Sequence, residues 1–235
     1  MNRRNFTQTA LMLGMGVASA PSIFAQTGAL ATHQFNLKYA PHLGMFKHSA
    51  GEDPIDQLNF MADQGFTAFE DNNMHTRSEA MQEKMGTTMQ KRNIAMGVFV
   101  AYKDFKKPTL ARGEADDRKD FLRQIEDAVP VAKRVNAKWV TVVPGTLDLK
   151  LVEDYQTANV IESLKQAAAI FEPHGIVMVL EPLNWYRNHA GLFLKEPTTV
   201  IQPDFCRDHT EIMLKAFQAT LTTNTHQITN SDANN

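Results

Sequence analysis

The stretch Ile176-Val-Met-Val-Leu-Glu181 decides the predicted fold. Five apolar residues follow Gly175 without the polar alternation of a half-exposed strand. Such a run is typical of a short strand buried on both faces, as in parallel sheets. A charge directly after it must face a partner, a metal ion or the solvated rim of the sheet, because a bare buried carboxylate is prohibitively costly. The stretch therefore predicts a parallel strand with a candidate functional carboxylate, Glu181, at its end.

The same pattern recurs upstream, where short apolar strands alternate with amphipathic helices. Strands are predicted at residues 35–40, 66–70, 94–100, 138–143 and 176–180. Helices are predicted at residues 54–64, 78–91, 121–135 and 160–171, the first with Asp53 as N-cap and Pro54 at its first position. This alternation indicates a parallel sheet with helical crossovers.

The spacing of these units favours a (β/α)₈ barrel, because about five βα units fall in residues 32–196, or roughly 30 residues per unit. A flavodoxin-like open sheet has the same rhythm. No GxGxxG or GxxxxGK[ST] motif follows a predicted strand, which disfavours nucleotide-binding open sheets. The predicted fold class is α/β, an incomplete (β/α)₈ TIM barrel.

The rhythm stops beyond Glu196. Residues 197–221 are predicted to form a divergent helical segment, and the polar tail TTNTHQITNSDANN at 222–235 is predicted to be disordered. We expect the barrel and its site to be incomplete, with a frameshift or an early stop as the hypothesis. An incomplete barrel would expose open sheet edges, so self-association through them is expected.

Residues 1–31 are predicted to be an export signal of the twin-arginine type. Arg3 and Arg4 precede a weakly apolar run from Ala10 to Ala20, which is far too short to span a bilayer. Ala29-Leu-Ala31 is a suitable cleavage site. An ordinary Sec signal is the alternative. The predicted location is the periplasm or the medium of a bacterial cell, without stable membrane insertion.

Composition excludes several classes of function. The formal net charge of −2 gives no electrostatic basis for binding nucleic acid or an anionic membrane. One cysteine, Cys206, excludes an intramolecular disulfide framework and a zinc ribbon.

Candidate site residues are those that follow the predicted strands, because functional groups of parallel βα folds gather at the carboxyl ends of the strands. These positions hold His42, Glu70, Asp71, Tyr102, Lys103, Pro144, Gly145, Glu181, Asn184 and His189. Simpler roles stay open for three of them: a rim position for Glu181, a backbone hydrogen bond for His42 and a structural salt bridge for Glu70.

Four motifs identify a resemblance that covers residues 34 to about 195. They are YAPHLGMF (39–46), DQLNFMADQGFTAFEDN (56–72), AKRVNAKWVTVVPG (132–145) and VMVLEPLNWYRNHAGLFL (177–194). Together they resemble the hydroxypyruvate isomerase family. That family is one of the xylose-isomerase-like TIM barrels, which also include ketose 3-epimerases and a DNA-repair endonuclease branch.

The resemblance implies a site with one divalent cation, Mn²⁺ or Mg²⁺, whose first ligand corresponds to Glu181. In such a site the cation and two carboxylates move a proton between adjacent carbons through an enediolate. It also implies that Glu181 is catalytic and that His42, Glu70, Asn184 and His189 bind substrate. The aspartate, histidine or glutamine, and glutamate expected after strands six to eight have no clear match, so the remaining ligands are unassigned.

The leading hypothesis is thus a metal-dependent isomerase or epimerase of a small sugar or hydroxy-carbonyl compound. The endonuclease branch is disfavoured by the near-neutral charge and the export signal. A non-catalytic, exported carbohydrate-binding remnant of the same fold is the alternative from another class.

Overall fold

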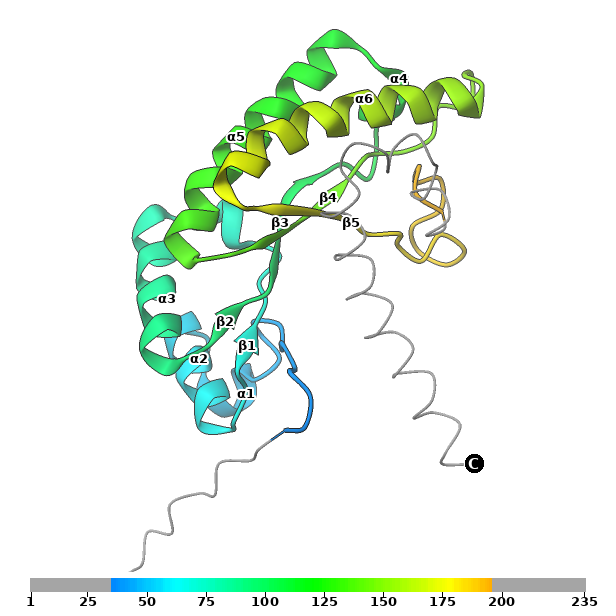
Figure 1. The fold of residues 1–235 in the computed structure, drawn as a ribbon. Coiled ribbons are helices and arrows are strands. Elements are labelled where there is room, and N and C mark those ends of the chain that lie inside the picture. Colours follow the sequence, from blue (N-terminus) through cyan, green and yellow to red (C-terminus); the bar gives the residue numbers. More distant parts are fainter. Residues whose placement is uncertain (1–34, 196–235) are drawn as a thin grey trace, which may run out of the picture. The chain divides into compact units, whose positions relative to one another are not determined.

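The computed structural model describes residues 35–195 of the chain (Figure 1). These residues all belong to one compact unit, which begins at Thr32. The sequence predictions for residues 1–31, 197–221 and 222–235 lie outside the described residues.

The helices begin where the sequence supplies caps. Helix α2 (Pro54–Asp63) starts after Asp53, whose side chain accepts a hydrogen bond from the Ile55 N–H at 2.7 Å. Helix α3 (Glu79–Arg92) starts after Ser78, whose hydroxyl accepts from Met81 N–H. The remaining helices are α1 (Lys47–Ala50), α4 (Thr109–Arg112), α5 (Ala115–Val135) and α6 (Glu153–Phe171), with short 3₁₀ turns η1 (Met74–Thr76) and η2 (Glu172–His174). The predicted helices are confirmed.

The strands are parallel, as predicted. Strand β1 (Ala68–Phe69) pairs with β2 (Ala95–Met96), and β4 (Trp139–Val143) lies between β3 (Val98–Lys103) and β5 (Val177–Leu180). Gly97 joins β2 to β3, and its N–H donates to the Phe69 carbonyl at 2.7 Å. The two pieces β2 and β3 therefore act as one strand between β1 and β4.

The predicted first strand, residues 35–40, is wrong. Among the described residues this segment makes no ladder, and the only pairing is an isolated parallel bridge between His42 and Glu70. The Glu70 N–H donates to the Pro41 backbone carbonyl at 3.1 Å, and the Leu43 N–H donates to the Glu70 backbone carbonyl at 3.2 Å. The apolar side chains that suggested a strand are exposed, so little burial favours pairing there. The Phe35 ring instead stacks on Phe66, with 4.7 Å between centroids.

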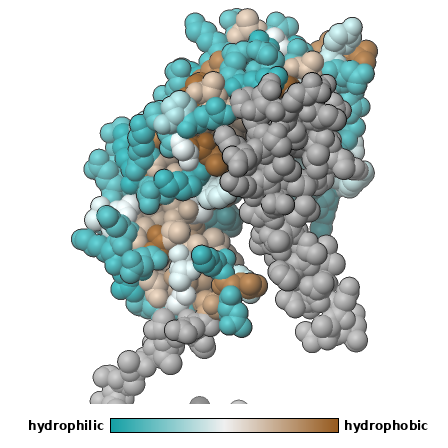
Figure 2. Space-filling model, in the orientation of Figure 1, coloured by the Kyte–Doolittle hydropathy of each residue, from teal (hydrophilic) through white to brown (hydrophobic). Residues whose placement is uncertain are grey.

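One face of the strands carries the helical layer. Helices α5 and α6 lie over β3, β4 and β5, and α3 lies beside β2 (Figure 1). The outer surface of these helices is mostly hydrophilic in Figure 2. Helices α3 and α5 approach closely at Gly86, where an added Cβ would lie 2.3 Å from the Arg134 carbonyl oxygen. A side chain at this position would force the two helices apart.

The strands pack against the helical layer through a core of apolar side chains. Members from the strands include Phe69, Phe99, Val140, Val142 and Met178, each no more than 4% exposed. Within residues 35–195, no helix is long and apolar enough to cross a membrane.

Candidate functional site

The carboxyl ends of the parallel strands bring two predicted acidic residues to one edge of the sheet. Glu70 directly follows Phe69 in β1, and Glu181 directly follows Leu180 in β5. Since side chains alternate along a strand, Phe69 and Leu180, which pack in the core, place their successors on the opposite face. Both carboxylates therefore stand on the face away from the helices, as the polar ends of a barrel interior do.

His42 is held against Glu70 by an ion pair. The distance from His42 Nε2 to Glu70 Oε1 is 2.5 Å, and the side chains are 45% and 24% exposed, respectively. The backbone bridge between the same two residues fixes their approach. The salt bridge considered for Glu70 is therefore present, and it remains open to solvent on the His42 side.

Glu70 and Glu181 act on each other electrostatically. Burial raises the pKa of the Glu70 carboxyl above its ordinary value of 4.5, and the negative charge of Glu181 raises it further, while His42 opposes both effects. Burial and the charge of Glu181 therefore both favour the protonated form of the Glu70 carboxyl. The structure thus brings together His42, Glu70 and Glu181.

The two other predicted substrate residues lie in the loop after β5. The backbone carbonyl of Asn184 accepts from Arg187, Asn188 and His189 N–H groups at 3.4, 3.3 and 3.1 Å, so Asn184 closes a turn. Its side chain is exposed. The His189 ring contacts Phe105, with 5.4 Å between centroids. His189 therefore faces the loop after β3 rather than the His42–Glu70 pair.

The loop after β5 is fastened to the end of β4. The Leu147 N–H donates to the Gly191 carbonyl at 2.8 Å, and the Phe193 N–H donates to the Gly145 carbonyl at 3.0 Å. Trp185 Nε1–H closes the loop on itself by donating to the Leu192 carbonyl at 2.9 Å. These bonds hold the loop at the carboxyl end of the sheet.

A polar network surrounds Asp71, a strand-end candidate whose partners Arg77, Gln82 and Arg134 were not predicted from the sequence. Asp71, only 3% exposed, forms an ion pair with Arg77 and accepts from Asn73 N–H at 3.1 Å. Gln82 donates to the Met74 and Arg77 carbonyls at 3.1 and 2.9 Å, and accepts from Arg134 at 3.0 Å. The position of Asp71 at a strand end was the only sequence signal, because its partners are chosen by tertiary packing.

Tyr102, another strand-end residue, has a structural role. Its hydroxyl donates to Thr109 Oγ1 at 2.8 Å, and Thr109 in turn donates to the Pro144 carbonyl at 3.3 Å. Burial raises the pKa of Tyr102 to about 12, although the Thr109 hydrogen bond opposes this effect. The chain of bonds ties the ends of β3 and β4 together.

The described residues do not supply a donor set for a divalent cation. No group of three or more His, Cys, Asp or Glu side chains in residues 35–195 is placed to hold a metal ion. Glu181, the predicted first ligand, is therefore not part of such a group within residues 35–195.

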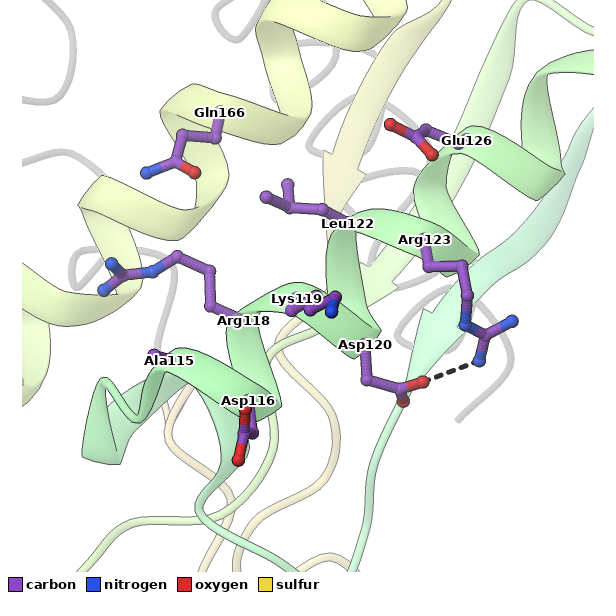
Figure 3. A pocket seen from close by; sticks show the side chains of 9 residues that line it. All are labelled: Ala115, Asp116, Arg118, Lys119, Asp120, Leu122, Arg123, Glu126 and Gln166. Carbon is purple, nitrogen blue, oxygen red and sulfur yellow. Dashed lines mark hydrogen bonds and ion pairs between the residues drawn. The ribbon is translucent and has the colours of Figure 1, made fainter.

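A pocket lies on the helical layer, away from the strand ends. It has a volume of about 690 Å³ and is lined by residues of α5 together with Gln166 of α6 (Figure 3). Two of the charged residues that line it, Asp120 and Arg123, form an ion pair at 2.6 Å. None of the predicted site residues lines it, so it is not the candidate site.

Parallel βα units with polar residues at the strand carboxyl ends place the chain in the class of βα-barrel proteins. The chain belongs to the xylose isomerase-like TIM barrel family, which its residues 58–211 match. The matched region extends past residue 194, where the last of the four sequence motifs ends. A comparison with curated proteins gives no match.

Solved structures with the same fold include sugar epimerases and an endonuclease-like protein. AP endonuclease, family 2, from Brucella melitensis has a TM-score of 0.54 at 19% identity, over 67% of this chain and 59% of that one. D-psicose 3-epimerase with D-tagatose, from Clostridium cellulolyticum H10, gives 0.57 at 15% identity, over 74% and 61%. A D-tagatose 3-epimerase-like protein gives 0.52 at 19% identity, over 67% and 57%. The chain thus spans about three fifths of the length of these structures.

Proposed function

We propose that this chain carries the proton-transfer groups of a sugar isomerase or epimerase that acts on a small hydroxy-carbonyl compound. The observation that carries the proposal is the electrostatic coupling of Glu70 and Glu181 at one edge of the sheet, with His42 paired to Glu70. Two carboxyl groups at one edge of the sheet, with the pKa of Glu70 raised, are suited to exchange a proton with a carbon acid.

Each group has a distinct role in the proposed reaction. Glu181, exposed at the end of β5, removes the proton from the carbon next to the substrate carbonyl, and the bonding electrons move onto the carbonyl oxygen. Glu70 is the proton donor of the proposed reaction, because burial and the charge of Glu181 raise the pKa of its carboxyl. An isomerisation is completed when a proton returns to the former carbonyl carbon and the hydroxyl proton of the neighbouring carbon moves to the former carbonyl oxygen, so that the neighbouring carbon becomes the new carbonyl. An epimerisation is completed when the proton returns to the opposite face of the original carbon and the electrons move back to restore the original carbonyl. His42 holds Glu70 Oε1 and leaves its second oxygen for the substrate.

The resemblance to metal-dependent isomerases implies that Glu181 also binds Mn²⁺ or Mg²⁺. A cation would polarise the substrate oxygens and stabilise the enediolate. Within residues 35–195, no group of three or more His, Cys, Asp or Glu side chains is placed to hold such a cation.

The substrate class rests on family membership and on the sequence motifs. Membership in the xylose isomerase-like TIM barrels and the shared fold with D-psicose 3-epimerase and a D-tagatose 3-epimerase-like protein support a sugar or related compound. The motif at 177–194, which resembles hydroxypyruvate isomerases, supports hydroxypyruvate as the first compound to test.

Non-catalytic carbohydrate binding is the second candidate function. It is favoured by the lack of a three-ligand group within residues 35–195, since one carboxylate with neutral partners can bind a polyol without metal chemistry.

Exchange of the substrate C–H proton with deuterium from solvent, followed by NMR, tests the proposal. Hydroxypyruvate, D-tagatose and D-fructose should be tried with and without Mn²⁺, with bound metal measured on the same protein. Glu181→Gln keeps the side-chain size but removes the base, so exchange should fall about a hundredfold or more. Glu126→Gln, an exposed change in α5, is the matched control. Saturable sugar binding without exchange would support the second candidate instead.

A further inference from the structure

Strand β3 contains a bulge just before its carboxyl end. Val100 pairs with Thr141 of β4, but Tyr102 pairs with the very next residue, Val142, so Ala101 has no partner of its own. Ala101 and Tyr102 consequently both contribute to the core, at 2% and 5% exposure. A bulge of this kind re-aims the side chains that follow it.

The bulge decides which face receives Lys103. In a regular strand, residue 103 would share the core face with Phe99 and Ala101. The extra residue instead turns Tyr102 into the helical layer, where its ring lies 4.8 Å from that of Phe121. Lys103, the last residue of β3, is exposed on the other face, which also carries Glu70 and Glu181.

The strand order places Lys103 between the two carboxylates. Glu70 follows β1 on one side of the joined β2–β3 strand, and Glu181 follows β5 on the other, beyond β4. No carboxylate among residues 35–195 lies within 4.0 Å of the Lys103 ammonium group. Its recorded contact is with the Phe105 ring, 6.0 Å from Nζ to the centroid.

Phe105 links Lys103 to the loop after β5. Its ring is 44% exposed and lies 5.4 Å from the His189 ring. A cation from the end of β3 and an imidazole from the loop after β5 thus both lie next to the Phe105 ring. A cation–π contact at an exposed position is weak, so an incoming anion can readily displace it.

We propose that Lys103 is an anion-binding residue, which takes a carboxylate or phosphate group of a ligand whose reacting carbons lie at Glu70 and Glu181. His189 supplies a second N–H donor, and the Phe105 ring forms the wall between them. Without such a cation, the two glutamates would repel an acidic ligand. The proposal rests on the proposed function for the place of the reacting carbons, but the anion preference is independent of turnover.

Calorimetric or NMR titration of the full chain with D-glycerate, glycerol 3-phosphate and glycerol tests this binding. We expect at least one anion to bind about tenfold more tightly than glycerol, and the tighter of the two identifies the group recognised. Lys103→Met should abolish the preference, Lys103→Arg should retain it, and Lys106→Met, an exposed lysine three residues away, should leave it unchanged. Unfolding temperatures of all variants should match, because the side chain is exposed.

A wild-type protein without anion preference, or a Lys103→Met variant that keeps it, would overturn the proposal. Failure of the proposed reaction has a different signature. Deuterium exchange would then be absent, whereas the Lys103-dependent preference for anions would persist, including in Glu181→Gln.

Discussion

Nε2 of His42 lies 2.5 Å from Oε1 of Glu70, and the same two residues form the parallel backbone bridge that brings the segment before α1 to β1. One contact thus serves two purposes: it aligns the backbone and holds one oxygen of a carboxylate at the strand ends. The raised pKa of Glu70 shows that burial and the charge of Glu181 outweigh the favourable charge of His42.

Removing the charge of Glu181 should lower the pKa of Glu70. In Glu181→Gln the repulsion between the carboxylates is lost, while burial and His42 are unchanged. Carboxyl ¹³C NMR titration of wild type and variant measures the difference. Glu126→Gln, on the exposed surface of α5, should leave the Glu70 titration where it is. An unchanged Glu70 pKa in Glu181→Gln would mean that the carboxylates are too far apart to cooperate.

Glu70 should also make stability depend on pH in a defined direction. The pKa of Glu70 in the folded state lies above the ordinary value of 4.5 that we take for the unfolded state. Between these two pKa values the folded state binds more protons than the unfolded state. The free energy of unfolding contributed by Glu70 is then fully present below pH 4.5 and falls as pH rises through the folded pKa. Urea unfolding at a series of pH values should show this decline in wild type and not in Glu70→Gln. A decline of equal size in both proteins would assign it to other groups.

Asp71 should contribute more to stability than an exposed partner of arginine. Asp71→Ala leaves Arg77 without its carboxylate and Asn73 N–H without an acceptor, so we expect a loss of about 2 kcal/mol. Asp63→Ala is the matched control, because Asp63 also pairs with an arginine but is 62% exposed. That change should cost less than about 1 kcal/mol in the same denaturant titration. Equal losses would show that the network around Asp71 adds no stability.

Tyr102 should ionise well above the ordinary tyrosine value of 10.0. Its pKa is raised to about 12 by burial, whereas Tyr155 and Tyr186 are 67% and 82% exposed. Absorbance at 295 nm should therefore show a late step that disappears in Tyr102→Phe. Because the raised pKa belongs to an acid, stability should fall as pH rises from 10 toward 12. At neutral pH, Tyr102→Phe loses the hydrogen bond to Thr109, and this should lower the free energy of unfolding by about 1 kcal/mol. A late step that survives in the variant would belong to another tyrosine.

Export can be tested through the first residues of the chain. If Ala29-Leu-Ala31 is the cleavage site, mass spectrometry of the exported protein should find Thr32 at its start. Changing both Arg3 and Arg4 to lysine should stop export through a twin-arginine route. Undiminished export of this variant would favour the Sec alternative. A mature start at Pro21 or an intact Met1 would contradict the predicted start at Thr32.

Much of the fold could be predicted from sequence because its signals are local. Asp53 and Ser78 cap their helices through hydrogen bonds to residues two or three positions on, and such signals are readable without any tertiary partner. The apolar run before Glu181 likewise specifies a buried strand by itself. The predicted strand at 35–40 failed because period and apolarity do not show whether a neighbour is present to pair with it.

The sequence by itself determined the βα order, the parallel sheet and the acidic residues that end its strands. Tertiary structure alone decided which of these residues act together. Glu70 contacts His42 beside their shared backbone bridge, and the parallel sheet brings Glu181 to the same edge, where its charge acts on Glu70. Arg77 contacts Asp71 through the packing of a loop. The face of Lys103 depends on one extra residue in the register between β3 and β4. Register is a property of two strands together, so no single stretch of sequence contains it.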